Sequence, residues 1–145
     1  MQDFVQKTKL CYVRCVSPED TLIRAHLRAP RNVGRLAEPC WRGRGENAAC
    51  GDVLELSLSV AGSRIGRALF QARGCSGVIA SASLATEALI GRSLREALEL
   101  DWSVLIDAAG GLAPRRAHAA QVVQRAVREA VGGALAAADG PAETP

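Results

Sequence analysis

Two cysteines, an aspartate and a histidine have the residue types and the spacing of a metal-binding set. Cys50 and Asp52 belong to the motif Ala-Cys-Gly-Asp, Cys75 follows a glycine, and His118 comes late in the chain. Thiolates and imidazoles favour zinc or iron, and a carboxylate can supply the fourth bond of a tetrahedral site. The four side chains therefore indicate a centre for zinc, iron or an iron-sulfur cluster.

The residues between the two cysteines predict a β-hairpin that brings the cysteines together. Residues 53–60 alternate apolar and polar side chains, which is typical of a half-buried strand. A turn at Gly62 and a second strand over residues 65–72 follow. Because a hairpin begins and ends at the same edge of its sheet, Cys50 and Cys75 are expected at the same end of the two strands.

Capping signals predict helices around this hairpin, and a short edge strand is expected over residues 41–44. Ser93 begins a capping box, and Ser17 has the pattern of an N-cap followed by proline at the first helical position. The predicted helices cover residues 17–28, 78–90, 93–100, 102–108 and 116–131. His118 then falls in the first turn of the last helix, and His26 is expected to serve packing or capping.

Composition narrows the class of protein. The 145 residues, of which 48% are hydrophobic, suffice for one domain with a core. A net charge of +3 without a basic block interleaved with aromatics argues against nucleic-acid binding. No apolar run is long enough to span a membrane, and the N-terminal residues lack the pattern of a secretory signal. The five cysteines are therefore expected in a reducing cytoplasm, as ligands or reactive thiols.

Four motifs in order resemble those of the NifU/IscU family of iron-sulfur cluster assembly scaffolds, over roughly residues 20–131. The motifs are HLRAPRNVG from His26, ACGD at 49–52, GCSGVIASASLATEALIG at 74–91 and GGLAPRRAH at 110–118. The resemblance implies an α+β domain with a small three-stranded antiparallel sheet and four to five helices. That domain is expected over residues 17–131, between a poorly ordered N-terminal extension (1–16) and a flexible C-terminal tail (132–145).

The resemblance also implies a function. A scaffold of this family is not an enzyme: it receives sulfur from a cysteine desulfurase, binds iron, builds a transient [2Fe-2S] cluster and passes it to apo-proteins. Cys50 and Cys75 match two cluster cysteines, and Asp52 and His118 match the family's aspartate and histidine. The segment 110–114 partly resembles a sequence that a dedicated chaperone reads, so a chaperone partner stays open, as does a homodimer around the cluster.

The sequence departs from the family at one position. The third cluster cysteine is replaced by Ala119, directly after the histidine. Cys40 is a candidate additional thiol, if its loop folds over the site. Two alternatives remain: a zinc-binding partner or regulator of a cysteine desulfurase that builds no cluster, and a thiol enzyme with a Cys-His pair. The spacing of Cys11 and Cys15 could mark a further metal pair, although it need not have a function.

Overall fold

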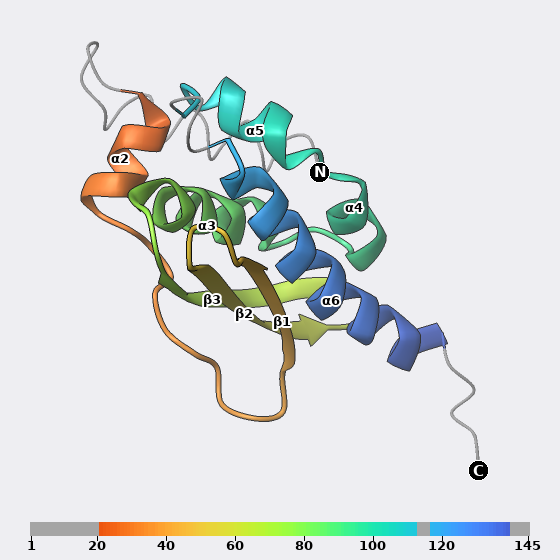
Figure 1. Cartoon of the computed structure of the whole chain (residues 1–145). Coiled ribbons are helices and arrows are strands. Elements are labelled where there is room, and N and C mark those ends of the chain that lie inside the picture. Colours follow the sequence, from red (N-terminus) through yellow and green to blue (C-terminus); the bar gives the residue numbers. More distant parts are fainter. Residues whose placement is uncertain (1–20, 113–116, 140–145) are drawn as a thin grey trace.

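The described residues form a three-stranded antiparallel sheet with helices on one face (Figure 1). The computed structural model describes residues 21–112 and 117–139. Strands β1 (Trp41–Asn47), β2 (Asp52–Ala61) and β3 (Arg64–Arg73) lie side by side in sequence order. The sheet and the five described helices confirm the predicted α+β class.

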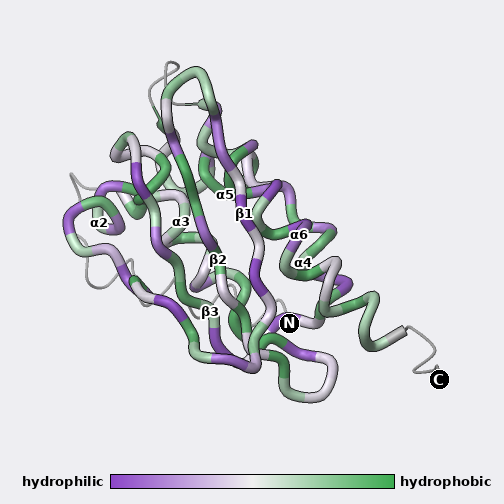
Figure 2. The backbone as a smooth tube through the Cα atoms, turned by 60° about the horizontal axis from the view of Figure 1, so that its bottom comes forward, coloured by the Kyte–Doolittle hydropathy of each residue, from purple (hydrophilic) through white to green (hydrophobic). Residues whose placement is uncertain are grey.

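The predicted hairpin of β2 and β3 is confirmed, and each strand extends one residue further at both ends than expected. The edge strand β1 continues to Asn47, three residues beyond its predicted end. Hydropathy alternates along β2 (Figure 2). Because successive side chains of a strand point to opposite faces, the apolar ones lie on the face that the helices cover. Leu54, Leu56 and Leu58 are consequently at most 3% exposed.

Two helices pack directly on the sheet, and three shorter helices pack on those two. Helix α3 (Ser76–Leu89) contacts β3, and α6 (Ala119–Asp139) crosses β1 and β2. Helix α2 (Leu22–Arg28) packs on α3, whereas α4 (Leu94–Glu99) and α5 (Trp102–Ala108) pack on α6 (Figure 1). The sheet and helices α3 to α6 share one apolar core, built largely from leucine, valine, isoleucine and alanine. Ile23 of α2 belongs to a smaller second cluster with residues of α3 and α5.

Two glycines of β1 allow α6 to lie unusually close to the sheet. A Cβ atom built at Gly43 would lie 1.9 Å from the carbonyl oxygen of Ala126, and one at Gly45 would lie 2.0 Å from that of Val122. Any side chain at either position would therefore push the helix away from the strand.

Helix α6 also covers the free edge of β1. The Glu129 carboxylate accepts the Arg44 backbone N–H at 3.0 Å, and the Arg125 guanidinium donates to the Glu46 carbonyl at 3.1 Å. These two side chains satisfy backbone groups that an edge strand otherwise leaves open to pairing with another chain.

The first described helix begins later than predicted. Thr21 is extended, with φ −102° and ψ 161°, and its hydroxyl accepts the Arg24 N–H at 3.3 Å, so that α2 begins at Leu22. A continuous helix over 17–28 was therefore wrong at its start, although its end at Arg28 is confirmed. The predicted cap, Ser17, and the extension 1–16 lie outside the described residues.

The last helix is longer than predicted at its C-terminal end. It begins at Ala119 and passes through Gly132 and Gly133 to Asp139, so that the predicted end at residue 131 was wrong. Ala134 is only 3% exposed and belongs to the core, and a Cβ built at Gly133 would lie 3.4 Å from the ring of Trp41. Packing against the sheet therefore continues the helix beyond two residues that favour its end.

A buried polar cluster joins α2 to α3. The His26 side chain is fully buried, as the packing role predicted, and its Nδ1 lies 2.6 Å from the Ser83 hydroxyl. The His26 Nε2 faces the Glu87 carboxylate at 3.7 Å. Burial, with a smaller contribution from the Arg31 charge, lowers the pKa of His26 to about 4, and burial raises the pKa of Glu87 to about 7.

Candidate metal centre

The strand register brings two of the predicted ligands to one end of the sheet, as the hairpin argument expected. Asn47 of β1 pairs with Asp52 of β2, and Val53 pairs with Arg73 of β3. The turn that carries Cys50 and the Gly74-Cys75 step therefore leave the sheet at the same end. His118 directly precedes α6, and its carbonyl accepts backbone N–H groups of the first helical turn.

Asp52 connects these elements. An aspartate at the start of a strand is ordinarily solvated, but the Asp52 side chain is only 1% exposed. The Oδ1 atom accepts the Cys75 backbone N–H at 2.8 Å, and Oδ2 is hydrogen-bonded to His118 Nε2 at 2.5 Å. The Cys75 sulfur lies 3.9 Å from Oδ2 and 4.0 Å from His118 Nε2.

Cys50 reaches the same centre from the turn between β1 and β2. One ligand atom each from Cys50, Asp52 and His118 lie within 4.8 Å of one another. The turn is closed by the N–H groups of Cys50 and Gly51, which donate to the Asn47 carbonyl at 3.2 and 2.9 Å. Cys50 is exposed, whereas Cys75 is half-buried and packs against the core. Cys50 and Cys75 thus each lie near Asp52 and His118.

The donor atoms of Asp52, Cys75 and His118 fit a shared tetrahedral metal with a small adjustment. Bonds of about 2.0 to 2.3 Å place the ligand atoms of such a site roughly 3.3 to 3.8 Å apart. The contacts of Cys75 with Asp52 and His118, at 3.9 and 4.0 Å, are already near that spacing. The Asp52–His118 hydrogen bond of 2.5 Å is shorter, so these two atoms must separate by about 1 Å to share a metal.

The beginnings of two helices flank this centre. Cys75 occupies the N-cap position of α3, where no side chain caps the helix, and His118 directly precedes α6. The N-terminal end of a helix carries partial positive charge and open N–H groups. Both helices therefore favour the negative charge that two thiolates and a carboxylate bring to the site.

The structure does not bring Cys40 to this centre. Cys40 directly precedes β1, whose other end, at Asn47, adjoins the candidate ligands. A strand of this length spans about 20 Å, and the Cys40 sulfur lies 3.7 Å from the Leu36 carbonyl instead. The loop of Cys40 does not fold over the site, so the prediction that Cys40 could serve as an additional ligand was wrong. Cys11 and Cys15 lie outside the described residues.

Ala119, which replaces the third family cysteine, is fully buried in the main core cluster. Its side chain is a methyl group and offers no donor atom. In the described part of the chain, the donors that meet here are therefore two thiols, one carboxylate and one imidazole.

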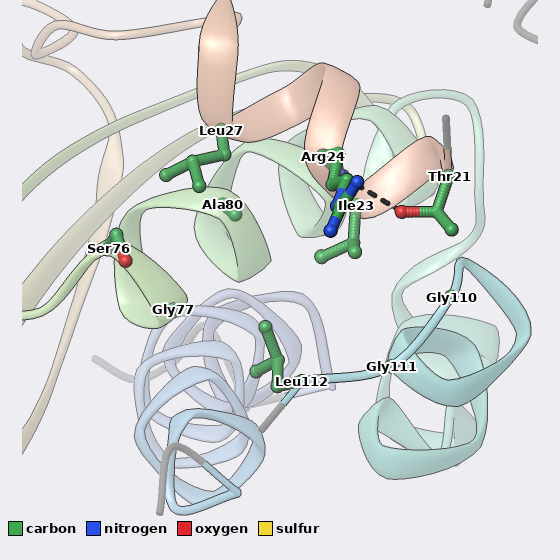
Figure 3. Close-up of a pocket in the computed structure, with 10 residues that line it drawn as sticks. All are labelled: Thr21, Ile23, Arg24, Leu27, Ser76, Gly77, Ala80, Gly110, Gly111 and Leu112. Atoms are coloured by element: carbon green, nitrogen blue, oxygen red, sulfur yellow. Dashed lines mark hydrogen bonds between the residues drawn. The ribbon is translucent and has the colours of Figure 1, made fainter. Parts of the chain in front are cut away.

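A cavity adjoins the centre on the side of α2, and nothing in the sequence analysis identified it. Figure 3 shows its lining, which combines α2, the first turns of α3 and the segment that follows α5. Its volume is about 660 Å³, and Ser76 and Gly77, which follow Cys75, form part of the wall. The double glycine at 110–111 was a signal of close approach, since a Cβ built at Gly110 would lie 2.4 Å from the Thr21 Cβ.

Comparisons with known proteins agree with this arrangement. The family model described as the NifU-like N terminal domain matches residues 19–136. The iron-sulfur cluster assembly scaffold protein IscU 1 of Archaeoglobus fulgidus is 34% identical over 106 residues, which cover 73% of this chain and 69% of that protein. The scaffold protein IscU of Azotobacter vinelandii is 37% identical over 110 residues, covering 73% of this chain and 85% of its own.

Solved structures support the fold. A crystal structure of a putative iron-sulfur cluster assembly scaffold protein from Fervidobacterium islandicum superposes with a TM-score of 0.66 at 20% identity, covering 77% of this chain and 95% of that one. The N-terminal part of a NifU-like protein from Brucella abortus superposes with a TM-score of 0.50 at 21% identity, covering 77% and 82%. Among the described residues, no helix is both long and apolar enough to cross a membrane.

Proposed function

Because the chain belongs to the NifU-like N-terminal domain family, we propose that it is an iron-sulfur cluster assembly scaffold. The observation that carries the proposal is the meeting of Cys50, Asp52, Cys75 and His118 at one end of the sheet. Thiolates bind soft iron, and this site offers two of them. The cluster is cargo here, assembled and then released.

The residues divide this task by chemistry. Cys50 and Cys75 supply the firm bonds to iron, whereas the Asp52 carboxylate and the His118 imidazole are weaker ligands for a [2Fe-2S] cluster. A cluster held in this way leaves easily, which suits transfer to apo-proteins. The exposed Cys50 faces solvent, where a cysteine desulfurase can deliver sulfur. Free thiols of this kind persist in a reducing compartment, and we place the protein in the cytoplasm.

The geometry fits binding better than thiol catalysis. In a catalytic triad, one imidazole nitrogen faces the nucleophile and the other faces the orienting carboxylate. Here the same nitrogen, His118 Nε2, faces both the Cys75 sulfur and Asp52. A single nitrogen that is hydrogen-bonded to the carboxylate is not free to take a proton from the thiol, so we propose a protein that binds and releases rather than an enzyme.

Anaerobic reconstitution with iron and sulfide tests the proposal. Wild-type protein is expected to gain the charge-transfer absorbance of a cluster, and Cys75→Ala is expected to lose it. Cys40→Ala is the matched control, because it removes a thiol at the other end of β1 and is expected to keep the full signal. Full absorbance in Cys75→Ala would contradict the ligand assignment.

One observation favours a second function. With Ala119 in the core and two thiols at the site within residues 21–112 and 117–139, the donor set also suits a closed zinc site. The protein would then be a zinc-binding partner or regulator of a cysteine desulfurase that builds no cluster. Gel filtration with a desulfurase, and desulfurase turnover with and without the protein, test this; a lack of complex and of any rate change would rule it out.

A further inference from the structure

Gly74 lies directly against Asp52 at the candidate centre. It precedes Cys75 with φ +134°, a backbone conformation that residues with a Cβ rarely adopt. A Cβ atom built there would lie 2.1 Å from Asp52 Oδ1, 2.9 Å from Asp52 Cγ and 2.8 Å from Asp52 Cα. The space that a side chain of residue 74 would need is therefore occupied by the Asp52 carboxylate.

The Asp52 backbone cannot move aside to make that room. Asp52 begins β2 and pairs with Asn47 of β1, while Val53 pairs with Arg73 of β3. The carboxylate is the part that is free to turn, and Oδ1 would have to shift by well over 1 Å to reach an ordinary contact distance of about 3.5 Å. Such a shift moves Oδ1 off the Cys75 N–H, now 2.8 Å away, and Oδ2 away from His118. The chain at residue 74 would also have to move away from the Asp52 Cα.

We propose that Gly74 is a positioning residue of the metal centre: its lack of a side chain holds the Asp52 carboxylate between Cys75 and His118. The inference rests on the proposed function, because it treats Asp52 as a ligand. Gly74 contributes no donor atom itself and acts only through the position of Asp52.

The proposal explains why a buried carboxylate stays at the edge of the site. The Cys75 N–H holds Asp52 Oδ1 at 2.8 Å, and this bond orients Oδ2 toward His118 and the Cys75 sulfur before a metal arrives. Partners that orient a ligand in this way typically account for 10- to 100-fold in metal affinity. Loss of the space at Gly74 is therefore expected to weaken metal binding by about that factor.

Zinc affinity, measured in competition with a chromophoric chelator on the full chain, tests the inference. Gly74→Ala is expected to bind zinc roughly 10- to 100-fold more weakly than wild type. Gly34→Ala is the matched control: Gly34 has φ +147°, and the atom nearest to a built Cβ, Leu69 Cδ1, lies at an ordinary 3.5 Å, so this variant bears a positive-φ cost without the short contact. It is expected to bind zinc as wild type does.

A double variant separates positioning from general damage. If Gly74 acts through Asp52, then Asp52→Ala and the double variant Asp52→Ala/Gly74→Ala bind zinc equally weakly, because the carboxylate is already gone. A further loss in the double variant, multiplying the two single losses, would overturn the inference. So would a folded Gly74→Ala with wild-type affinity.

A fold readout keeps the test decisive if Gly74→Ala does not fold. Removing the Asp52 carboxylate relieves the contacts at 2.1 and 2.9 Å and leaves the one at 2.8 Å to the Asp52 Cα, so the double variant is expected to be better folded than Gly74→Ala. A double variant no better folded than Gly74→Ala would contradict the inference. Failure of the scaffold proposal is distinguishable: wild type would then build no cluster, although Gly74→Ala still loses zinc.

Discussion

Glu87→Gln is expected to make the stability of the fold more sensitive to acid than that of the wild-type protein. The folded state holds His26 with a pKa of about 4, lowered from 6.5, and Glu87 with a pKa of about 7, raised from 4.5. Between these values the unfolded chain binds the proton of His26 more tightly, whereas the folded chain binds that of Glu87 more tightly. Acidification therefore destabilises the fold through His26 and stabilises it through Glu87.

The magnitudes follow from the two shifts. For the fully buried His26, a pKa lowered by about 2.5 costs roughly 3 kcal/mol of stability as the pH falls from 7.5 to 4.5. Protonation of Glu87 stabilises the fold by about 2 kcal/mol over the same range, after allowance for solvent screening at its partly exposed side chain. Wild type is thus expected to lose only about 1 kcal/mol through this pair, and Glu87→Gln about 3.

Urea unfolding at pH 7.5 and 4.5, in the presence of a reductant and a metal chelator, measures the difference. Glu99→Gln is the control, because Glu99 is an exposed glutamate at the end of α4 and its replacement is expected to follow wild type at both pH values. If Glu87→Gln lost no more stability than wild type on acidification, the reasoning about the buried pair would be refuted.

Two further predictions concern the frame around the site. Gly45→Ala is expected to cost about 1 to 3 kcal/mol or more in urea unfolding, because its Cβ would lie 2.0 Å from the Val122 carbonyl oxygen. Gly66→Ala is its control, since the nearest atom to a Cβ there is 3.5 Å away; equal stability of the two variants would contradict the packing argument. Ser93→Ala is expected to cost about 1 kcal/mol, because both hydrogen bonds of the capping box are present, at 3.2 and 2.9 Å. A neutral effect of Ser93→Ala on thermal unfolding would show that the cap is dispensable.

Local signals in the sequence were sufficient for the elements that they specify locally. The alternation over β2, the turn at Gly62 and the capping box at Ser93 each act within a few residues, and each is confirmed. The hairpin alone was enough to place Cys50 and Cys75 at one end of the sheet. Their meeting with His118 was anticipated through a family resemblance, because no local pattern links residues so distant in sequence.

What the sequence did not predict depends on contacts between distant segments. Helix α6 passes through Gly132 and Gly133 because its apolar face continues to pack on the sheet, and packing outweighs the preference of glycine to end a helix. The burial of Asp52 and the need for Gly74 beside it arise only once β2 and α3 meet. Cys40 could not be placed from its neighbours Pro39 and Trp41, since its distance from the site is set by the direction of β1.

The most direct test of the scaffold account is the iron, zinc and acid-labile sulfide content of the protein purified anaerobically from cells with an active desulfurase. The account predicts iron and sulfide in near-equal amounts in wild type and in Cys40→Ala, and neither in Cys75→Ala. Zinc without sulfide in wild-type protein would contradict it and would favour a zinc-binding regulator with the same fold.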